Sequence, residues 1–201
     1  MVRLHYFDFP GRGEAIRDAL RLGAVPFEDI RISFPEFQAR RAAGQLPWDV
    51  LPVLELEDGT LVSQSNTILR WAGVRAGLTP ADPGYALRVD ALLDSTEDYM
   101  GRVSVSIRVA DEAVRAGLRV ELATRWLPEW FGLLERRLAE AGHGWLVGDA
   151  LGIADLKVIH FIDKLVNGSL SGLRPDALSD FPALAAWRDR VHAERRARLP
   201  G

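Results

Sequence analysis

The chain has 201 residues, and none of them is cysteine. This absence excludes a disulfide framework and any metal site built on thiolates. It also excludes a redox-active cysteine pair and a protein thiol as the nucleophile of a covalent mechanism. Any thiol chemistry that the protein performs would therefore use a sulfur atom that its ligand brings.

Long apolar runs and an excess of one charge are also missing. No stretch approaches the roughly 18–20 apolar residues of a membrane span. The first residues, MVRLHYFDF, enter a predicted strand without the apolar core of a signal peptide. The formal net charge is −3, with basic residues scattered among acidic ones, which argues against nucleic acid as the main partner. We expect a cytoplasmic protein with neither a membrane nor a nucleic-acid partner.

The composition is that of a folded globular protein, with 48% hydrophobic and 26% charged residues. This length is enough for one large or two small domains, each able to bury a core.

The first 50 residues alternate between strand and helix patterns. The predicted elements are a strand Val2–Phe7, a helix Glu14–Leu22, a strand Phe27–Ile32, a weakly helical stretch Phe34–Ala43 and a loop Gly44–Val50. The preference for right-handed crossovers predicts that the two strands are parallel.

The stretch LPVLELEDGTLVSQSNTILRWAG, residues Leu51–Gly73, carries the strongest local signals. Alternating residues predict strands over 53–57 and 60–63, joined by a two-residue Asp58-Gly59 turn. Ser65 is a suitable N-cap for a helix over 65–72. With the preceding elements, the order β-α-β-α-β-β-α is the thioredoxin-like arrangement.

Beyond residue 75 the strand signals disappear. Residues 75–84, rich in glycine and proline, are interpreted as a linker between a domain at 1–75 and a domain at 84–201. The predicted helices of the second domain are Tyr85–Ala116, Arg119–Ala141 with a kink at Pro128, Ile153–Val166 and Phe181–Glu194. The fold class is therefore an α/β, thioredoxin-like domain followed by an all-α helical bundle.

Leu-Pro before the hairpin and Gln-Ser at the following helix start, together with LHYFDFPGRGEAIR, resemble the cytosolic glutathione transferases. The resemblance is closest to the Tyr-type sigma class, within the alpha, mu, pi and sigma group. It implies a cis peptide bond before Pro52 and antiparallel pairing of the Leu51 backbone with the cysteinyl unit of glutathione. It also implies that Gln64 and Ser65 hold the γ-glutamyl end.

Tyr6 is the activating residue that the resemblance implies. A free thiol of this kind has a pKa of about 8.5, so little thiolate exists at neutral pH. A tyrosine hydroxyl that donates a hydrogen bond to the sulfur favours the charged form and lowers that pKa. Arg12, which opens the first helix, would reach toward a carboxylate of glutathione or toward the thiolate.

The glycyl end of the glutathione site departs from the family pattern. Arg41 stands where sigma-type members carry a basic residue for the glycine carboxylate, but Phe37 replaces their tryptophan and Val50 replaces the usual glutamine. Neither Phe nor Val has a side-chain hydrogen-bond donor. We expect this end to be held differently or more loosely, with Gln45 or Trp48 as substitutes.

In the second domain, Asp94 matches an aspartate that reaches across a homodimer interface to the γ-glutamyl amine. It shares a helix face with two other acidic residues, and we interpret that face as solvated or dimer-facing and predict no metal. Gly148–Leu156 resembles the family's capping segment, in which Asp155 would accept a hydrogen bond from the Gly152 N–H.

The second substrate would be a hydrophobic electrophile, contacted by Phe7, Phe9, Met100 and Ser104. Glutathione would be the cosubstrate, without a metal. Conjugation is the primary interpretation. Two alternatives stay open: a glutathione-dependent isomerase or hydroperoxide peroxidase, and a non-catalytic module that binds a ligand or partner on the same fold.

Overall fold

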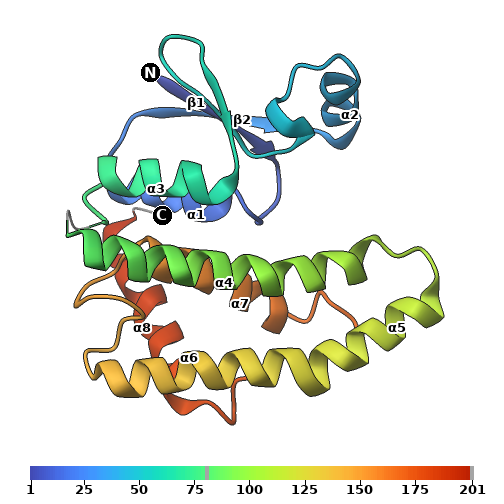
Figure 1. Ribbon diagram of the computed structural model, residues 1–201, viewed down its shortest axis with the longest axis vertical. Helices are drawn as coiled ribbons and strands as arrows, with labels where there is room; N and C mark the ends of the chain where they lie inside the picture. The colour runs from blue at the N-terminus through green and yellow to red at the C-terminus, as the bar shows by residue number, and fades with distance from the viewer. Residues whose placement is uncertain (80–81, 200–201) are drawn as a thin grey trace. The chain divides into compact units, whose positions relative to one another are not determined.

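The computed structural model describes residues 1–79 and 82–199 and divides the chain into two compact units, Met1–Ala81 and Asp82–Gly201 (Figure 1). The predicted linker includes residues 80 and 81, and the predicted second domain includes 200 and 201, so these parts of the predictions lie outside the described residues. None of the helices in the described ranges is long and apolar enough to cross a membrane.

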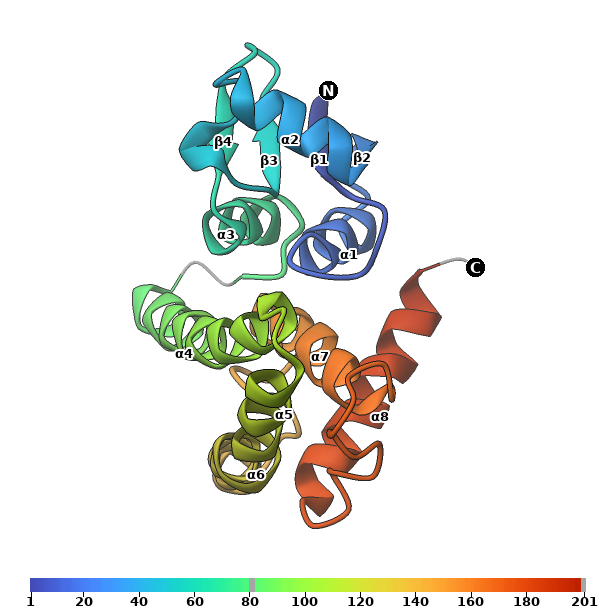
Figure 2. The same cartoon turned by 90° about the vertical axis from the view of Figure 1, so that its right-hand side faces the viewer.

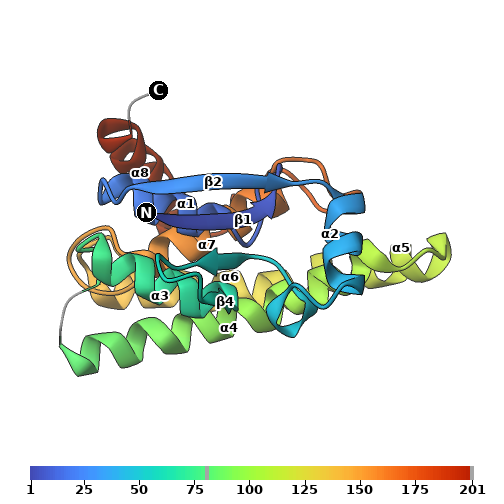
Figure 3. The same ribbon diagram turned by 90° about the horizontal axis from the view of Figure 1, so that it is seen from above.

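Over residues 1–79, the first unit is a four-stranded mixed sheet with three α-helices. In chain order its elements are β1 (Val2–Phe7), α1 (Glu14–Leu22), β2 (Phe27–Ile32), α2 (Phe34–Ala42), β3 (Val53–Glu55), β4 (Leu61–Ser63) and α3 (Ser65–Arg75). The strand order is β2-β1-β3-β4. The first two strands are parallel, as predicted, and lie side by side in Figure 3, while β3 pairs antiparallel with β1 and β4.

The faces of this sheet are unequally covered. Figure 2 shows α1 and α3 together on one face, whereas Figure 3 shows α2 beyond the ends of β1 and β2. The core lies on the α1 and α3 side, where Leu4, Ile16, Leu54 and Ile68 are at most 1% exposed. In contrast, α2 has no buried residue. This helix therefore depends little on core packing, and its side chains remain available at the surface.

The hairpin and the start of α3 differ in detail from the predictions. Glu55 pairs with Leu61, so the connection is longer than the predicted two-residue turn. The Gly59 N–H donates to the Leu56 carbonyl, and Gly59 has a φ of +84°. Ser65 is the first helical residue and not the N-cap. Gln64 occupies the N-cap, and no side chain caps the helix there.

The second unit consists entirely of helices and their connections among the described residues. They are α4 (Pro83–Arg108), α5 (Glu112–Glu121), a π-helical turn (Leu122–Trp126), α6 (Leu127–Ala141), α7 (Ile153–Val166) and α8 (Pro182–Arg198). Trp130, Phe131 and Trp187 are each 1% exposed, and α7 is buried over most of its length. The apolar pattern of α7 thus marks the centre of the bundle.

The prediction of one helix over Tyr85–Ala116 is wrong. The chain leaves the helix at Val109, whose φ and ψ are −67° and 122°, and begins α5 after Asp111. The Asp111 side chain accepts a hydrogen bond from Val114 N at 2.9 Å, which satisfies one of the unpaired N–H groups of a new helix. The next helix therefore starts before Arg119 and reaches α6 through the π turn, which ends two residues before Pro128.

Asp155 ties three segments of the second unit together. Its carboxylate accepts hydrogen bonds from Gly152 N at 3.0 Å, as predicted, from Leu146 N at 3.0 Å and from Trp187 Nε1 at 2.7 Å. Burial raises the pKa of this carboxyl to about 6, because loss of hydration outweighs the three hydrogen bonds.

Candidate functional site

The sheet topology brings the predicted glutathione-binding segments to one edge. His5 pairs with Val53, and Val53 pairs with Ser63. The end of β1, the start of β3 and the end of β4 therefore meet. The residues that adjoin this edge are Tyr6 and Phe7 in β1, Leu51-Pro52 before β3, and Gln64-Ser65 after β4.

Tyr6 is held in a closely packed position. Its side chain is only 5% exposed, and its hydroxyl accepts a hydrogen bond from Arg12 N at 3.0 Å. That bond uses a lone pair of the oxygen and does not use the phenol proton. The Arg12 backbone thus contacts the predicted activating residue directly, while the role of the Arg12 side chain stays a prediction.

Two glycines make room for the Tyr6 ring. A Cβ atom on Gly13 would lie 2.5 Å from Tyr6 Cδ1, and one on Gly11 would lie 2.5 Å from the Tyr6 hydroxyl oxygen. Neither distance is compatible with a side chain unless the ring moves. The GRG segment therefore reflects close approach to a ring, and it is not a phosphate loop.

Arg17 joins α1 to the end of β1. Its side chain is 0% exposed and donates to Glu14 Oε2 at 2.9 Å, to Asp29 Oδ1 at 3.0 Å and to the Phe7 carbonyl at 3.0 Å. The guanidinium carbon also lies 5.5 Å from the Tyr6 ring centroid, within cation–π range. Arg17 thereby fixes the backbone next to Tyr6.

The Leu51–Pro52 peptide bond is cis, as the resemblance implies. Before it, Trp48 and Asp49 have φ values of +56° and +54°, and Trp48 is 82% exposed. After β4, Gln64 has a φ of +78°. Non-glycine residues with such φ values cluster at ligand-binding sites, because the surrounding structure must hold them there. Ser65, at the start of α3, is 8% exposed.

The predicted residues of α2 lie near the same edge. Phe37 contacts Phe7 edge-on, with ring centroids 5.4 Å apart. Arg40 donates to Glu36 at 2.6 Å and lies 3.4 Å from His5 Nδ1. The guanidinium of Arg41 is exposed and forms no hydrogen bond or ion pair with the residues that the structure describes. A carboxylate could therefore bind Arg41 without displacing a protein partner.

Phe7 and Phe9, predicted to contact the electrophile, belong to an aromatic cluster. Their rings stack with centroids 5.1 Å apart and an interplanar angle of 9°. Phe9 is 53% exposed, and its centroid lies 5.9 Å from that of Tyr6. Phe34 extends the cluster 6.4 Å from Phe7. No contact with a substrate was predicted for Phe34, although it begins the predicted helical stretch.

The remaining predicted residues lie on α4 in the second unit. Asp94 is exposed, Met100 is partly exposed, and Ser104 donates its hydroxyl proton to the Met100 carbonyl at 2.7 Å. Of the two acidic neighbours of Asp94, Glu97 forms an ion pair with the buried Lys157 of α7. That carboxylate has a structural partner.

Comparison with known proteins adds independent information. The family model described as the C-terminal domain of glutathione S-transferase matches residues 97–197. Glutathione S-transferase 2 of Caenorhabditis elegans is 32% identical over 169 residues, which cover 82% of this chain and 88% of that protein.

Two solved structures extend the likeness over nearly the whole chain. Prostaglandin synthase D of Nilaparvata lugens superposes with a TM-score of 0.84 at 29% identity, covering 95% of this chain and 92% of that one. Na-GST-3, described as a monomeric glutathione S-transferase of the hookworm Necator americanus, gives 0.78 at 28% identity and covers 96% and 91%. The fold is thus a thioredoxin-like unit followed by a helical unit. The chain belongs to the glutathione S-transferase family.

Proposed function

We propose that the protein is a glutathione transferase that conjugates the glutathione thiolate to hydrophobic electrophiles and uses Tyr6 as the activating residue. One observation carries this proposal: the sheet topology gathers Tyr6, Leu51-Pro52 and Gln64-Ser65 at one edge. The family relationship supports conjugation, because the relatives that span most of the chain are named glutathione S-transferases.

In the proposed mechanism the thiol of bound glutathione loses its proton to solvent, and Tyr6 donates a hydrogen bond to the resulting thiolate. A tyrosine phenol ordinarily has a pKa of about 10, so a residue of this type can donate its proton in the working range. The Arg12 N–H, bonded to the phenol oxygen, makes that proton a better donor. The thiolate then attacks an electrophilic carbon, and a leaving group departs or the substrate takes up a proton.

Glutathione would be bound by backbone and side-chain groups of the N-terminal domain, 1–75. The Leu51 backbone would pair with the cysteinyl unit, and Gln64 and Ser65 would hold the γ-glutamyl end. Arg41 would bind the glycine carboxylate, since its guanidinium has no described protein partner. Phe37 and Val50 would contact the glycyl end without hydrogen bonds from their side chains.

The electrophile would contact the aromatic residues Phe7 and Phe9 together with Met100 and Ser104 of the helical domain, 84–201. The ring of Phe7, stacked on the exposed ring of Phe9, favours an apolar substrate. We further propose a cytoplasmic, metal-independent detoxification enzyme that acts as a homodimer, in which Asp94 reaches the γ-glutamyl amine of the other protomer.

A glutathione-dependent isomerase is the second candidate. It is favoured by the structural likeness to a protein of Nilaparvata lugens that is named prostaglandin synthase D. A hydroperoxide peroxidase would use the same thiolate. Activity measurements with a haloarene, an endoperoxide and an organic hydroperoxide would separate these three reactions.

The test of the proposed function is a pH titration of the thiolate absorbance of bound glutathione. A charge-assisted hydrogen bond from Tyr6, worth about 1.5–3 kcal/mol, should place the thiol pKa at about 6.5–7.5. Tyr6→Phe should return it toward about 8.5 and lower kcat/KM roughly 10- to 100-fold at pH 6.5.

Tyr85→Phe is the matched control, because the Tyr85 hydroxyl donates to the Val147 carbonyl within the helical unit. This variant should keep the thiolate titration of the wild type. A protein that is retained on immobilised glutathione but shows no lowered thiol pKa would instead be the non-catalytic binding module. A Tyr6→Phe protein with the wild-type titration would show that Tyr6 is not the activating group.

A further inference from the structure

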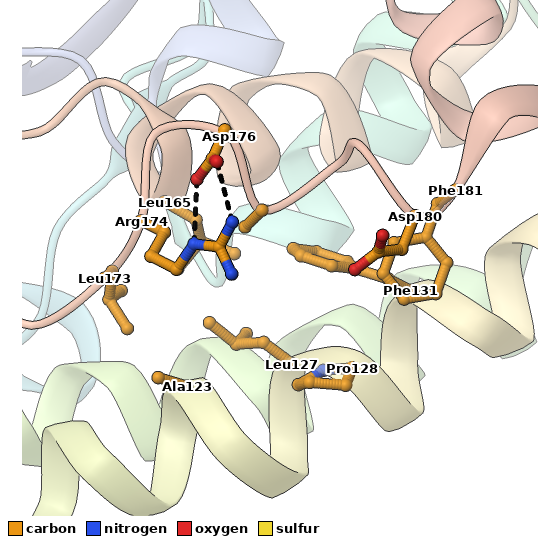
Figure 4. Close-up of a pocket in the computed structure, with 11 residues that line it drawn as sticks. Ala123, Leu127, Pro128, Phe131, Leu165, Leu173, Arg174, Asp176, Asp180 and Phe181 are labelled. Atoms are coloured by element: carbon orange, nitrogen blue, oxygen red, sulfur yellow. Dashed lines mark hydrogen bonds and ion pairs between the residues drawn. The ribbon is translucent and has the colours of Figure 1, made fainter.

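The second unit contains a pocket whose residues play no part in the proposed reaction. The π turn and α6 form one side of this pocket. The segment that connects α7 to α8 forms the other side (Figure 4). Its residues are Ala123, Leu127, Pro128, Phe131, Leu165, Leu173, Arg174, Asp176, Ala177, Asp180 and Phe181. All of them belong to the second unit.

The inner wall of this pocket is apolar, and the volume of the pocket suits one aromatic ring. Leu127, Phe131 and Leu165 are at most 4% exposed, and the volume is about 130 Å³. An apolar cavity of about 150 Å³ is known to bind benzene. Phe131 and Phe181 meet edge-on, with centroids 5.6 Å apart and planes at 74°. An aromatic ring can pack against such a pair.

The wall formed by residues 170–181 is fixed at both ends. Arg119, 5% exposed, donates to the Ser171 carbonyl at 3.0 Å and to Ser106 Oγ at 2.6 Å. At the other end, Glu135 accepts hydrogen bonds from Ala183 N at 2.9 Å and Leu184 N at 2.7 Å. A site that exists before the ligand arrives loses little free energy in ordering itself.

The mouth of the pocket carries two carboxylates and one guanidinium. Arg174 donates to Asp176 through Nε at 2.9 Å and through the terminal nitrogen at 2.6 Å, which is a bidentate pair. The pKa of Arg174 is raised first by these hydrogen bonds and further by the charge of Asp180. Asp180 itself forms no ion pair or hydrogen bond from its side chain with a residue that the structure describes.

These charges favour a cation over an anion. An anionic ligand would have to compete with Asp176 for Arg174, whereas a cation meets the carboxylate of Asp180, which Figure 4 shows next to Phe181 and Phe131. A cation within about 6 Å of the face of Phe131 or Phe181 would gain a further attraction. From the volume, the aromatic wall and this charge, we propose that the pocket binds a monocyclic aromatic amine in its ammonium form, independently of the glutathione site.

The test measures binding of three matched probes to the full-length wild-type chain by saturation-transfer NMR and calorimetry. The probes are benzylamine, benzyl alcohol and benzoate, which present one ring with a positive, neutral or negative end. A ligand as small as benzylamine should bind to the pocket with a Kd of roughly 1 mM. Benzylamine should bind about fivefold more tightly than benzyl alcohol, the factor that one exposed ion pair provides, and benzoate should bind most weakly.

Three variants locate the site. Asp180→Asn should remove the preference for benzylamine and leave the affinity for benzyl alcohol unchanged, whereas Asp189→Asn, at an exposed position of α8, should change neither. Ala123→Phe should fill the pocket and abolish binding of all probes, with circular dichroism as the check on folding. Saturating glutathione should not change the affinity for benzylamine.

Each contrary result overturns the proposal. Benzylamine binding that survives in Ala123→Phe, or that glutathione displaces, would place the amine elsewhere. An undiminished benzylamine preference in Asp180→Asn would show that this carboxylate does not select the cation, and no saturation transfer with any probe would show that the pocket binds no such ring. Since none of these measurements uses conjugation activity, their failure would leave the proposed transferase function untouched.

Discussion

The Tyr6 ring occupies a space that two glycines leave open, and this makes the site sensitive to a single methyl group. In Gly13→Ala the new Cβ would lie 2.5 Å from the ring, so either Tyr6 or the start of α1 must move. We expect kcat/KM to fall at least tenfold and the pKa of the bound thiol to rise, because misplacing a catalytic group by about 1 Å can cost 10²-fold.

The control for this substitution is Gly117→Ala on α5, where an added Cβ meets nothing within 4 Å. Here alanine should stabilise the helix by about 0.5–1 kcal/mol without affecting kinetics. Equal loss of activity in both variants would mean that a general effect, and not the position of Tyr6, explains the Gly13 result.

Arg17 and Arg21 form a second matched pair. Both approach Glu14 and Asp29, but Arg17 is fully buried and also binds the Phe7 carbonyl, while the Arg21 side chain is 42% exposed. Urea unfolding should show that Arg17→Gln costs about 2–3 kcal/mol, because it removes hydrogen bonds from a fully buried guanidinium to two carboxylates and leaves the Phe7 carbonyl without its donor. Arg21→Gln should cost less than about 1 kcal/mol. Similar losses would contradict the difference in burial.

Local motifs were sufficient to predict the candidate residues around Tyr6, Leu51 and Gln64, because each sits at a recognisable strand end or helix start. They were not sufficient for Arg17. In the sequence it is an ordinary helical arginine, and its burial depends on Asp29, which lies on β2. The positive φ of Gln64 was equally invisible, since it arises from the way β4 and α3 meet.

At the scale of secondary structure, long periodic segments were predicted well and their interruptions were not. The boundaries of α1 and α7 match the predictions, because both helices have clear apolar faces and clear end signals. The break at residues 109–111 was missed, because the residues around it are compatible with a helix. The structure shows instead that the Asp111 side chain begins a new one.

The capping carboxylate of α7 predicts a pH dependence of stability. The pKa of Asp155 rises from 3.8 to about 6 on folding, so the folded state holds this proton more tightly than the unfolded state. The stabilisation is fully present below about pH 4 and is lost as the pH rises through 6, with a total change of about 3 kcal/mol.

This contribution can be isolated by urea unfolding of the wild type and Asp155→Asn at several pH values between 4 and 7.5. The amide cannot ionise, so the advantage of the wild type over the variant should shrink as the pH rises from 4 to 6.5 and then stay constant. An advantage that grows over this interval would show that the carboxyl has a lowered pKa in the folded protein.

For the molecule as a whole, the order of strands and helices predicted the thioredoxin-like unit and the all-α unit that follows it. Sequence periodicity could not predict the pocket beside the π turn, because that pocket forms where helix α6 meets a connection that has no periodic pattern. The solved relatives agree with the predicted fold over nearly the whole chain.

The proposed homodimer can be tested by complementation. If Asp94 serves the site of the other protomer, a heterodimer of Tyr6→Phe and Asp94→Ala protomers has one site with both defects and one intact site. Random mixing of the two impaired variants should then add about one quarter of the wild-type activity to their residual activities, since about half of the dimers are mixed. No recovery, or sedimentation of the wild-type protein as a monomer, would contradict the shared site.

The carboxylate of Asp155 binds groups from the connection before α7, from the first turn of α7 and from α8. If any one of these segments opens, the same buried acceptor is exposed. No segment can therefore open alone at a low free-energy cost. In native-state hydrogen exchange the amides of Leu146 and Gly152 and the indole N–H of Trp187 should therefore share one opening free energy and behave as a single cooperative unit.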